Sequence, residues 1–217
     1  MTSRHVLIID DHPLFRDAMK GVLASVLHNA EIHEAASLEE SARILAGDFD
    51  FELALLDLKM PGVQGLSGLA YFRAQFPAVP VVIVSGQEEP AVIRRALALG
   101  ASGFIPKSSS ADDMRKAVQT VLDGEVWSPA ISQVVGDDER EVNDLTRRLA
   151  TLTPQQVRVL MMLRSGLLNK QIAYELDVSE ATVKAHVSAI LLKLNVDSRT
   201  QAVIAAGRID GESISET

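Results

Sequence analysis

The first 122 residues alternate short apolar runs with segments of helical periodicity, and this alternation limits the possible folds more than any other feature. Short runs rich in Val, Ile and Leu are typical of strands that are buried on both faces of a parallel sheet. The intervening segments predict helices that cover such a sheet, so we expect one α/β domain. The predicted strands lie near residues 5–10, 31–35, 53–57, 81–85 and 103–106, and the predicted helices near 13–27, 38–47, 66–76, 90–99 and 110–123.

The composition changes after Asp123-Gly124, where Gly, Pro, Ser and acidic residues become common. We expect residues 126–150 to form a linker that is partly helical, with a helix ending near Ala150. The sequence Thr153-Pro154-Gln155-Gln156 then combines a helix N-cap, a proline at the first helical position and a capping-box glutamine. Because strand-like alternation is missing from residues 151–217, we expect a small all-α domain there. Its predicted helices run from 154 to about 166 and near 169–176, 180–194 and 199–207.

Cysteine is absent from the chain, which excludes disulfides and thiolate metal sites. The apolar run near the N-terminus is too short for a secretory signal or a membrane-spanning helix. We therefore expect a cytoplasmic protein that does not engage a membrane.

Charge is distributed unevenly along the chain. Residues 1–127 hold 11 Lys and Arg against 17 Asp and Glu, and residues 128–150 hold 3 against 5. Residues 151–217 are balanced, with 7 basic and 7 acidic side chains. The first two thirds should repel polyanions, so only a local basic face in the last third could contact nucleic acid.

Three acidic residues stand where predicted strands end. Asp10 and Asp11 follow one apolar run, and Asp57 follows another. Because the carboxyl ends of parallel strands meet at one edge of a sheet, the three carboxylates should lie together. Mg²⁺ is typically held by one or two carboxylates, waters and a substrate phosphate. The three residues therefore predict a magnesium-dependent site that handles a phosphoryl group.

Asp57 also has the position of a nucleophile. The turn at Pro61-Gly62 should carry the chain away and leave its side chain exposed. A carboxylate can form an acyl phosphate when a cation neutralises the crowded negative charge. Ser85 and Lys107, at two further strand ends, could donate hydrogen bonds to phosphoryl oxygens. Each residue alone is explained more simply as a turn or strand-end residue, but their convergence predicts a phosphoryl site.

On these residues, positions 1 to about 125 resemble the receiver domain of two-component response regulators. The resemblance implies a flavodoxin-like α/β fold, a five-stranded parallel sheet in the order 2-1-3-4-5. It also implies Mg²⁺ as cofactor and a histidine kinase as phosphodonor. In this resemblance, Asp10, Asp11 and Asp57 correspond to the metal-binding residues of the family, and Asp57 is also the phosphoacceptor. Ser85 corresponds to the switch residue and Lys107 to the invariant lysine.

Phe104 corresponds to the aromatic switch residue of receivers, whose ring is expected to turn inward when Ser85 moves toward the phosphoryl group. An ordinary core aromatic would have the same sequence signature. Pro106 precedes Lys107, whereas many receivers have a proline after the lysine. This leaves the isomer of the Lys107-Ser108 peptide bond open.

Residues 152–207 resemble the LuxR-type helix-turn-helix domain of the NarL/FixJ subfamily, through Leu152-Thr153-Pro154, residues 166–173 and residues 182–187. The resemblance implies double-stranded DNA as a partner. The third helix of this domain should bury the apolar stripe Val183, Val187, Ile190 and Leu194. The opposite side would meet DNA, with Lys184, Ala185 and Ser188 in the groove, Thr182 and Asn169 or Lys170 at phosphates, and Lys193 and Arg199 nearby.

This DNA-binding face is poor in cations, because Ala185, Ala189 and Leu192 stand where relatives carry polar or basic residues. Because few cations would neutralise few DNA phosphates, a single copy of the domain should bind DNA weakly. We therefore hypothesise that a homodimer binds paired half-sites, when the protein is phosphorylated or on DNA.

The sequence thus predicts a phosphorylation-controlled, DNA-binding transcription regulator rather than an enzyme. One alternative keeps the receiver but gives the helical domain a protein partner, which the low basic content would suit. A metal-dependent phosphatase is the least favoured alternative, because the first domain offers no general acid for a foreign substrate. Its histidines, His5, His12, His28 and His33, are predicted to be surface or edge residues.

Overall fold

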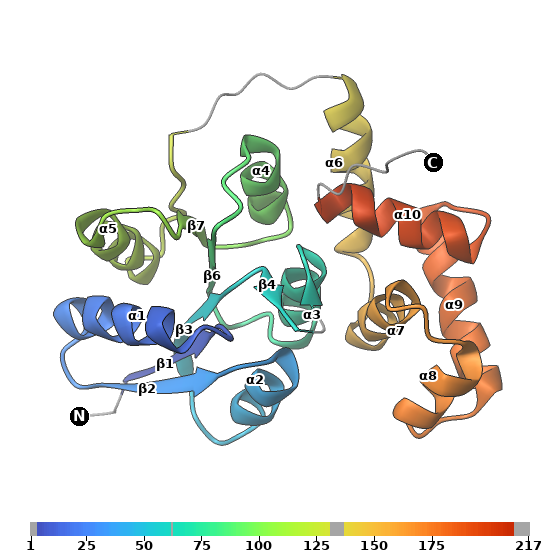
Figure 1. Ribbon diagram of the computed structural model, residues 1–217, viewed down its shortest axis with the longest axis horizontal. Coiled ribbons are helices and arrows are strands. Elements are labelled where there is room, and N and C mark those ends of the chain that lie inside the picture. The colour runs from blue at the N-terminus through green and yellow to red at the C-terminus, as the bar shows by residue number, and fades with distance from the viewer. Residues whose placement is uncertain (1–3, 62, 131–136, 211–217) are drawn as a thin grey trace.

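A computed structural model describes residues 4–61, 63–130 and 137–210 (Figure 1). Gly62 of the predicted turn, part of the predicted linker and the last seven residues of the expected helical domain lie outside the described residues. Within these ranges, none of the helices is both long and apolar enough to cross a membrane.

The N-terminal unit is a five-stranded parallel sheet with the strand order β2-β1-β3-β6-β7. Counted along the chain, these strands give the predicted order 2-1-3-4-5. The predicted helices are also present, with ends within two residues of their expected positions. The elements are β1 (Arg4–Ile9), α1 (Pro13–Val26), β2 (Ala30–Ala35), α2 (Leu38–Leu45), β3 (Phe51–Leu56), α3 (Ser67–Gln75), β6 (Val81–Ser85), α4 (Pro90–Ala98), β7 (Gly103–Pro106) and α5 (Ala111–Leu122).

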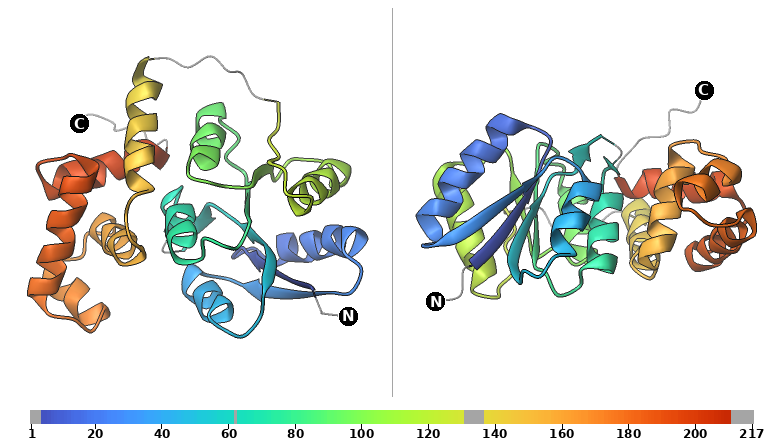
Figure 2. Two further views of the ribbon diagram at one scale, coloured as in Figure 1. Left: turned by 180° about the vertical axis from the view of Figure 1, so that it is seen from behind. Right: turned by 90° about the horizontal axis from the view of Figure 1, so that it is seen from below.

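Helices cover both faces of the sheet (Figure 2). On β1, Val6 and Ile8 pack with residues of α1 and α5, whereas Leu7 and Ile9 pack with residues of α2, α3 and α4. This division follows from the two-residue period of a strand, which sends successive side chains to opposite faces. An antiparallel pair, β4 (Lys59–Met60) with β5 (Val63–Gln64), was not predicted, because such short strands leave no detectable period.

The C-terminal unit is helical throughout its described residues, as predicted. The apolar stripe on α9 is confirmed, with Val183, Ile190 and Leu194 buried and Val187 packed against the same core. Thr153 and Gln156 form the predicted capping box at the start of α7. The helices are α6 (Asp137–Leu149), α7 (Pro154–Arg164), α8 (Asn169–Glu175), α9 (Glu180–Leu194) and α10 (Arg199–Asp210), the last of which runs beyond its predicted end.

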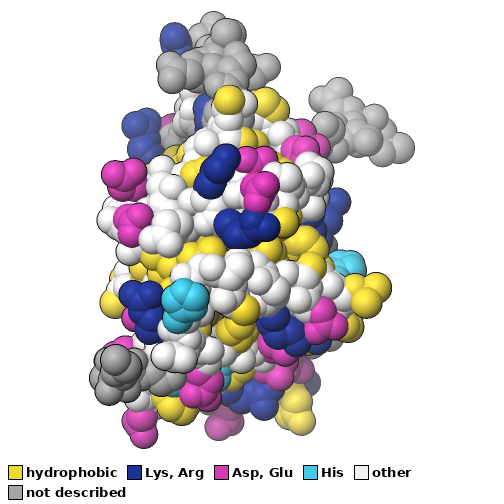
Figure 3. All heavy atoms as spheres, turned by 90° about the vertical axis from the view of Figure 1, so that its left-hand side faces the viewer, with side chains coloured by type: hydrophobic (Ala, Val, Ile, Leu, Met, Phe, Trp, Pro, Cys, Tyr) yellow, Lys and Arg dark blue, Asp and Glu magenta, His cyan; other side chains and the backbone are white. Residues whose placement is uncertain are grey.

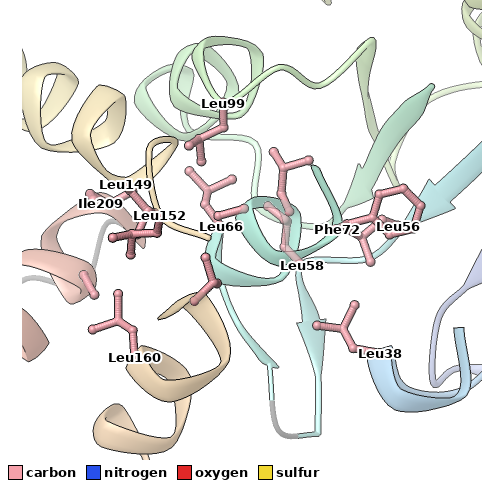
Figure 4. Packing of buried hydrophobic residues seen from close by; sticks show 14 of the residues in the cluster. Leu38, Leu56, Leu58, Leu66, Phe72, Leu99, Leu149, Leu152, Leu160 and Ile209 are labelled. Carbon is pink, nitrogen blue, oxygen red and sulfur yellow. The ribbon is translucent and has the colours of Figure 1, made fainter. Parts of the chain in front are cut away.

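The two units share a continuous apolar core (Figure 4). Leu66 at the start of α3 belongs to the same cluster as Leu152 and Leu160 from the helical unit. Helix α3 packs against α7, and α6 packs against α4 and α10. The predicted linker therefore contains a docked helix, which buries Val142 and Leu149.

Polar contacts reinforce this docking at the C-terminal end of α10. The Arg95 guanidinium on α4 donates to the carbonyls of Arg208 and Ile209, at 3.1 and 2.9 Å. A cation at this helix end satisfies carbonyls that lack intrahelical partners. Asp210 accepts a hydrogen bond from the Leu66 backbone N–H at 2.5 Å and forms an ion pair with Arg164. Both side chains of this ion pair are almost fully buried.

We predict that Asp210→Ala destabilises the protein by about 3–5 kcal/mol, because it removes the buried carboxylate that pairs with Arg164 and accepts a hydrogen bond from the Leu66 N–H. Urea denaturation followed by circular dichroism should show a lower midpoint. Asp197→Ala, which truncates an exposed aspartate of the same unit, should stay within about 0.5 kcal/mol of the parent. Equal midpoints for the two variants would contradict the prediction.

Candidate phosphoryl-acceptor site and nucleic-acid interface

Strand pairing brings the three carboxylates together. The Asp57 N–H donates to the Ile9 carbonyl at 2.9 Å, which continues the β1–β3 ladder by one residue. The Asp10 N–H donates to the Ala35 carbonyl at 3.0 Å on the other side of β1. One oxygen each from Asp10, Asp11 and Asp57 and one ring nitrogen of His12 all lie within 4.8 Å of one another. The carboxylates therefore meet at one edge of the sheet, as their strand-end positions predicted.

Lys107 joins the carboxylates from the far strand of the sheet. Ser85 and Pro106 are partners in the β6–β7 ladder, and the Lys107 N–H donates to the Ser85 carbonyl at 2.8 Å. This register directs the lysine so that its Nζ lies 2.7 Å from both Asp57 Oδ2 and Asp10 Oδ2. The same ammonium lies 4.5 Å from the centre of the Phe15 ring, within the range of a cation–π contact.

The expectation that the Asp57 side chain is exposed was wrong, since the residue is only 3% exposed. The Lys107 side chain lies against one carboxylate oxygen, and the Lys59 N–H donates to the other at 3.2 Å. His12 Nδ1 lies 3.9 Å from Asp57 Oδ2. The carboxyl group is reached through a hollow of about 510 Å³, which is lined by Asp57, His12, Leu14, Phe15, Ala18, Lys59, Gly86 and Lys107.

Burial and charge act in opposite directions on the titration of this cluster. Burial raises the pKa of Asp57 above its ordinary value, and the nearby Lys107 offsets only part of that rise. Burial alone would lower the pKa of Lys107, but its contacts with the Asp10 and Asp57 carboxylates outweigh this effect and raise it. The lysine therefore stays charged while ionisation of Asp57 carries an energetic cost.

The oxygen atoms of this cluster suit a hard divalent cation. Asp10 Oδ2 and Asp11 Oδ1 are buried and accept no hydrogen bond of good geometry, although Lys107 Nζ lies 2.7 Å from the first and His12 Nδ1 lies 2.8 Å from the second. Buried acceptors without hydrogen bonds are rare in proteins and call for a specific explanation. Carboxylate oxygens are the ligands that Mg²⁺ prefers, so the group fits the predicted cofactor.

Ser85 and Phe104 are both fully buried. The Ser85 hydroxyl accepts a hydrogen bond from the Gln87 N–H at 3.2 Å. The Phe104 ring belongs to the core on the side of α4, so its side chain is directed inward. The Lys107-Ser108 bond is trans, like every peptide bond in the described ranges.

Sequence reasoning missed two residues of this site, His12 and Phe15. His12 was predicted to be a surface or edge residue, and its ring is largely exposed, yet its Nδ1 lies 3.0 Å from Asp10 Oδ1 and 2.8 Å from Asp11 Oδ1. The sequence feature that could have identified these two residues is the helix start at Pro13, which places the first turn of α1 over the strand ends. His5, predicted in the same way, is buried at the other end of the sheet.

The predicted DNA-contacting residues fall into two groups. The first group lies on α8 and α9, which stand at the end of the molecule farthest from the sheet (Figures 1 and 2). The Thr182 hydroxyl there lies 2.9 Å from the hydroxyl of the N-cap Ser179. The exposed members are Lys170, Thr182, Lys184, Ala185 and Ser188, and Asn169 is half-buried at the start of α8.

The second group, Lys193 and Arg199, is held by intramolecular contacts. Lys193 Nζ donates to the Thr151 carbonyl and to Gln156 Oε1, both at 2.8 Å. Arg199 donates to the Leu167 carbonyl. The helix α9 face therefore has even fewer available cations than its sequence indicated. On the face of the N-terminal unit drawn in Figure 3, Lys and Arg are interspersed with Asp and Glu, so no broad basic surface replaces them there.

Comparisons with known proteins agree with this architecture. Residues 6–119 match the response regulator receiver domain, and residues 150–206 match the luxR family of bacterial regulatory proteins. The fold and the acidic site thus define a receiver protein. With its second domain, the chain belongs to the LuxR-family response regulators of two-component systems, which are DNA-binding transcription regulators.

Similar proteins include the glycerol metabolism activator of Pseudomonas putida, which is 43% identical over 94% of this chain and 96% of its own length. The nitrate/nitrite response regulator protein NarL of Escherichia coli K12 is 36% identical over 92% of this chain and 93% of its own length. A solved structure of RcsB dimers bound to DNA covers 96% of this chain and all of its own chain, with a TM-score of 0.54 and 20% identity. That structural similarity supports the fold.

We predict that Lys107→Met raises the pKa of Asp57 further, because the offsetting ammonium is lost. A raised folded-state pKa means that ionisation of Asp57 opposes folding, a cost that appears as pH rises through that pKa. The variant should therefore lose more stability at pH 7 than at pH 4, by about 1.4 kcal/mol for each unit of additional pKa rise.

Carboxyl-carbon NMR titration and urea denaturation at the two pH values would measure these effects. Lys116→Met, at an exposed site on α5, should change neither quantity. An unchanged or lower pKa of Asp57 in Lys107→Met would show that the lysine does not control this carboxyl group.

Proposed function

We propose that Asp57 is the phosphoacceptor of this response regulator. The observation that carries the proposal is the Asp57 carboxylate, which contacts Lys107 and lies beside two further carboxylates at the mouth of a hollow. A nucleophilic carboxylate needs nearby positive charge while a phosphoryl group approaches it. Lys107 provides one such charge and would bind a phosphoryl oxygen once the acyl phosphate has formed.

We also infer that Asp10, Asp11 and Asp57 together hold Mg²⁺. When bound, this ion neutralises negative charge on the carboxylates and the phosphoryl oxygens. The buried oxygens of Asp10 and Asp11 that lack hydrogen bonds support this assignment. A histidine kinase is the proposed phosphodonor. A protein that meets such a kinase and chromosomal DNA would work in the cytoplasm.

The proposed switch consists of Ser85 and Phe104. Phosphorylation would draw the Ser85 hydroxyl away from the Gln87 N–H and toward a phosphoryl oxygen. Movement of Ser85 would change the packing of the Phe104 ring on the side of α4. Helix α4 carries Arg95, which contacts the end of α10, so this path leads from the site to the helical domain. Couplings of this kind are typically about 1–3 kcal/mol.

DNA binding is assigned to the outer face of α8 and α9, with Lys184, Ala185 and Ser188 in the major groove. Thr182 and either Asn169 or Lys170 would contact backbone phosphates. We propose that Lys193 and Arg199 support this face through the contacts described above. Because the exposed cations are few, a homodimer on paired half-sites would supply the affinity.

The alternative that the helical domain binds a protein partner rested on its low basic content alone. The luxR-family match over residues 150–206 disfavours it. We propose no turnover of a foreign substrate, since the named relatives are regulators.

We predict that Asp57→Asn abolishes phosphorylation by acetyl phosphate in the presence of Mg²⁺, measured by intact-protein mass spectrometry. The variant should keep its circular dichroism spectrum and lose no thermal stability, because the amide removes a buried charge. Asp50→Asn, at an exposed position, should still be labelled. Stable labelling of the Asp57→Asn protein would refute the assignment of the nucleophile.

We predict that Lys184→Ala weakens binding to a DNA sequence selected with the phosphorylated protein by about 1–3 kcal/mol, roughly 5- to 150-fold. Gel-shift titration would measure the loss. Lys116→Ala, on α5, should bind normally, whereas Lys193→Ala should lower the thermal midpoint because it removes two hydrogen bonds. Normal DNA binding by Lys184→Ala would exclude this residue from the interface.

A further inference from the structure

A second group of metal-ligating side chains lies at the other end of the sheet, where β1 and β2 begin. His5 and Glu31 are direct partners in the parallel β1–β2 ladder. His33 lies two residues further along β2, so it shares a face of the sheet with Glu31. One donor atom from each of these three residues lies within 4.8 Å of the others.

The two imidazole rings are held in place by packing. His5 Nδ1 lies 3.0 Å from His33 Nε2, so the rings face each other through nitrogen atoms. The His5 ring lies 4.5 Å from the Phe49 ring, and the His33 ring lies 5.0 Å from the Phe51 ring, measured between centres. The His5 and His33 side chains are 11% and 17% exposed. These contacts fix the two nitrogens without help from a ligand.

Glu31 supplies a more adaptable donor to the same position. Its two carboxylate oxygens lie 3.8 Å from His5 Nδ1 and 3.8 Å from His33 Nε2. The Glu31 side chain is 56% exposed, so it can turn toward the rings with little repacking. Two ring nitrogens and a carboxylate thus lie close together, and the exposed Glu31 side chain leaves the group open to solvent on one side.

We propose that His5, Glu31 and His33 form a binding site for a divalent transition metal. With metal–nitrogen bonds of about 2.05 Å, ring nitrogens 3.0 Å apart would subtend an angle of about 94° at the ion. Tetrahedral coordination would need a separation of about 3.4 Å. The spacing therefore fits adjacent positions of an octahedral or tetragonal ion such as Ni²⁺. Glu31 must approach by less than about 1 Å, and water would fill the remaining positions.

The donor types distinguish this site from the carboxylate cluster around Asp57. Imidazole nitrogens suit Ni²⁺, Cu²⁺, Fe²⁺ and Zn²⁺, whereas Mg²⁺ takes oxygen donors. The two sites lie at opposite ends of β1 and would select different ions. A bound transition metal would also fasten the start of β1 to β2, which should raise the thermal stability of the folded state.

Isothermal titration of the full-length, untagged protein with NiCl₂ tests this proposal. Excess Mg²⁺ in the buffer keeps the carboxylate cluster occupied. We expect one Ni²⁺ per chain and a higher thermal midpoint with Ni²⁺. His33→Gln and Glu31→Gln should each weaken binding at least tenfold, because even residues that only support metal ligands change affinity by about 10–100-fold.

Two matched controls separate this site from other histidines. His28→Gln, at an exposed position, and His12→Gln, beside the carboxylates, should both bind Ni²⁺ like the parent. Because Glu31 is exposed, its variant should keep the fold even if the His33 variant does not. The proposal would be overturned by unchanged Ni²⁺ binding in Glu31→Gln or by loss of binding in His12→Gln. It would also be overturned if the parent did not bind Ni²⁺, and the contact between His5 and His33 would then be a simple hydrogen bond.

Discussion

The ion-pair cluster of Lys107 with Asp10 and Asp57 is the interaction on which the rest of the acidic site depends. Parallel pairing forces carboxylates from two neighbouring strands to the same edge, where burial opposes the ionisation of Asp57. A lysine from the far strand offsets part of this cost by lying 2.7 Å from both groups. The site is therefore held together by charges that a phosphoryl group and a cation would rearrange.

A regulator of this kind also needs a mechanical route from the acidic site to the DNA-binding helices. In this structure the helical unit shares a core with the sheet unit, and α10 ends against Arg95 of α4. The outer side of α9, by contrast, lies at the far end of the molecule (Figure 1). Docking therefore holds the helical unit without covering the residues that we propose contact DNA. Phosphorylation would then control DNA binding through the position of the helical unit or through dimerisation.

The sequence predicted most of the fold because its local signals agreed with one another. Apolar strand runs, the Thr153 capping box and the α9 stripe each indicated one structure, and each was confirmed. Errors arose where a contact from a distant segment decided the outcome. Asp57 was expected to be exposed because it precedes a turn, but Lys107 covers it from fifty residues away in the chain. The sequence also could not show that Lys193 hydrogen-bonds to the Thr151 carbonyl and Gln156 Oε1, or that Arg199 hydrogen-bonds to the Leu167 carbonyl.

The sequence by itself determined the two-part architecture and the edge of the sheet at which the carboxylates meet. These features follow from periodicity and from the rule that parallel strands end on the same side. Only the tertiary structure decided the burial of Asp57, the docking of α6 and the approach of His5 to His33. Each of these depends on side chains that meet across long sequence separations, and local patterns carry no information about such distances.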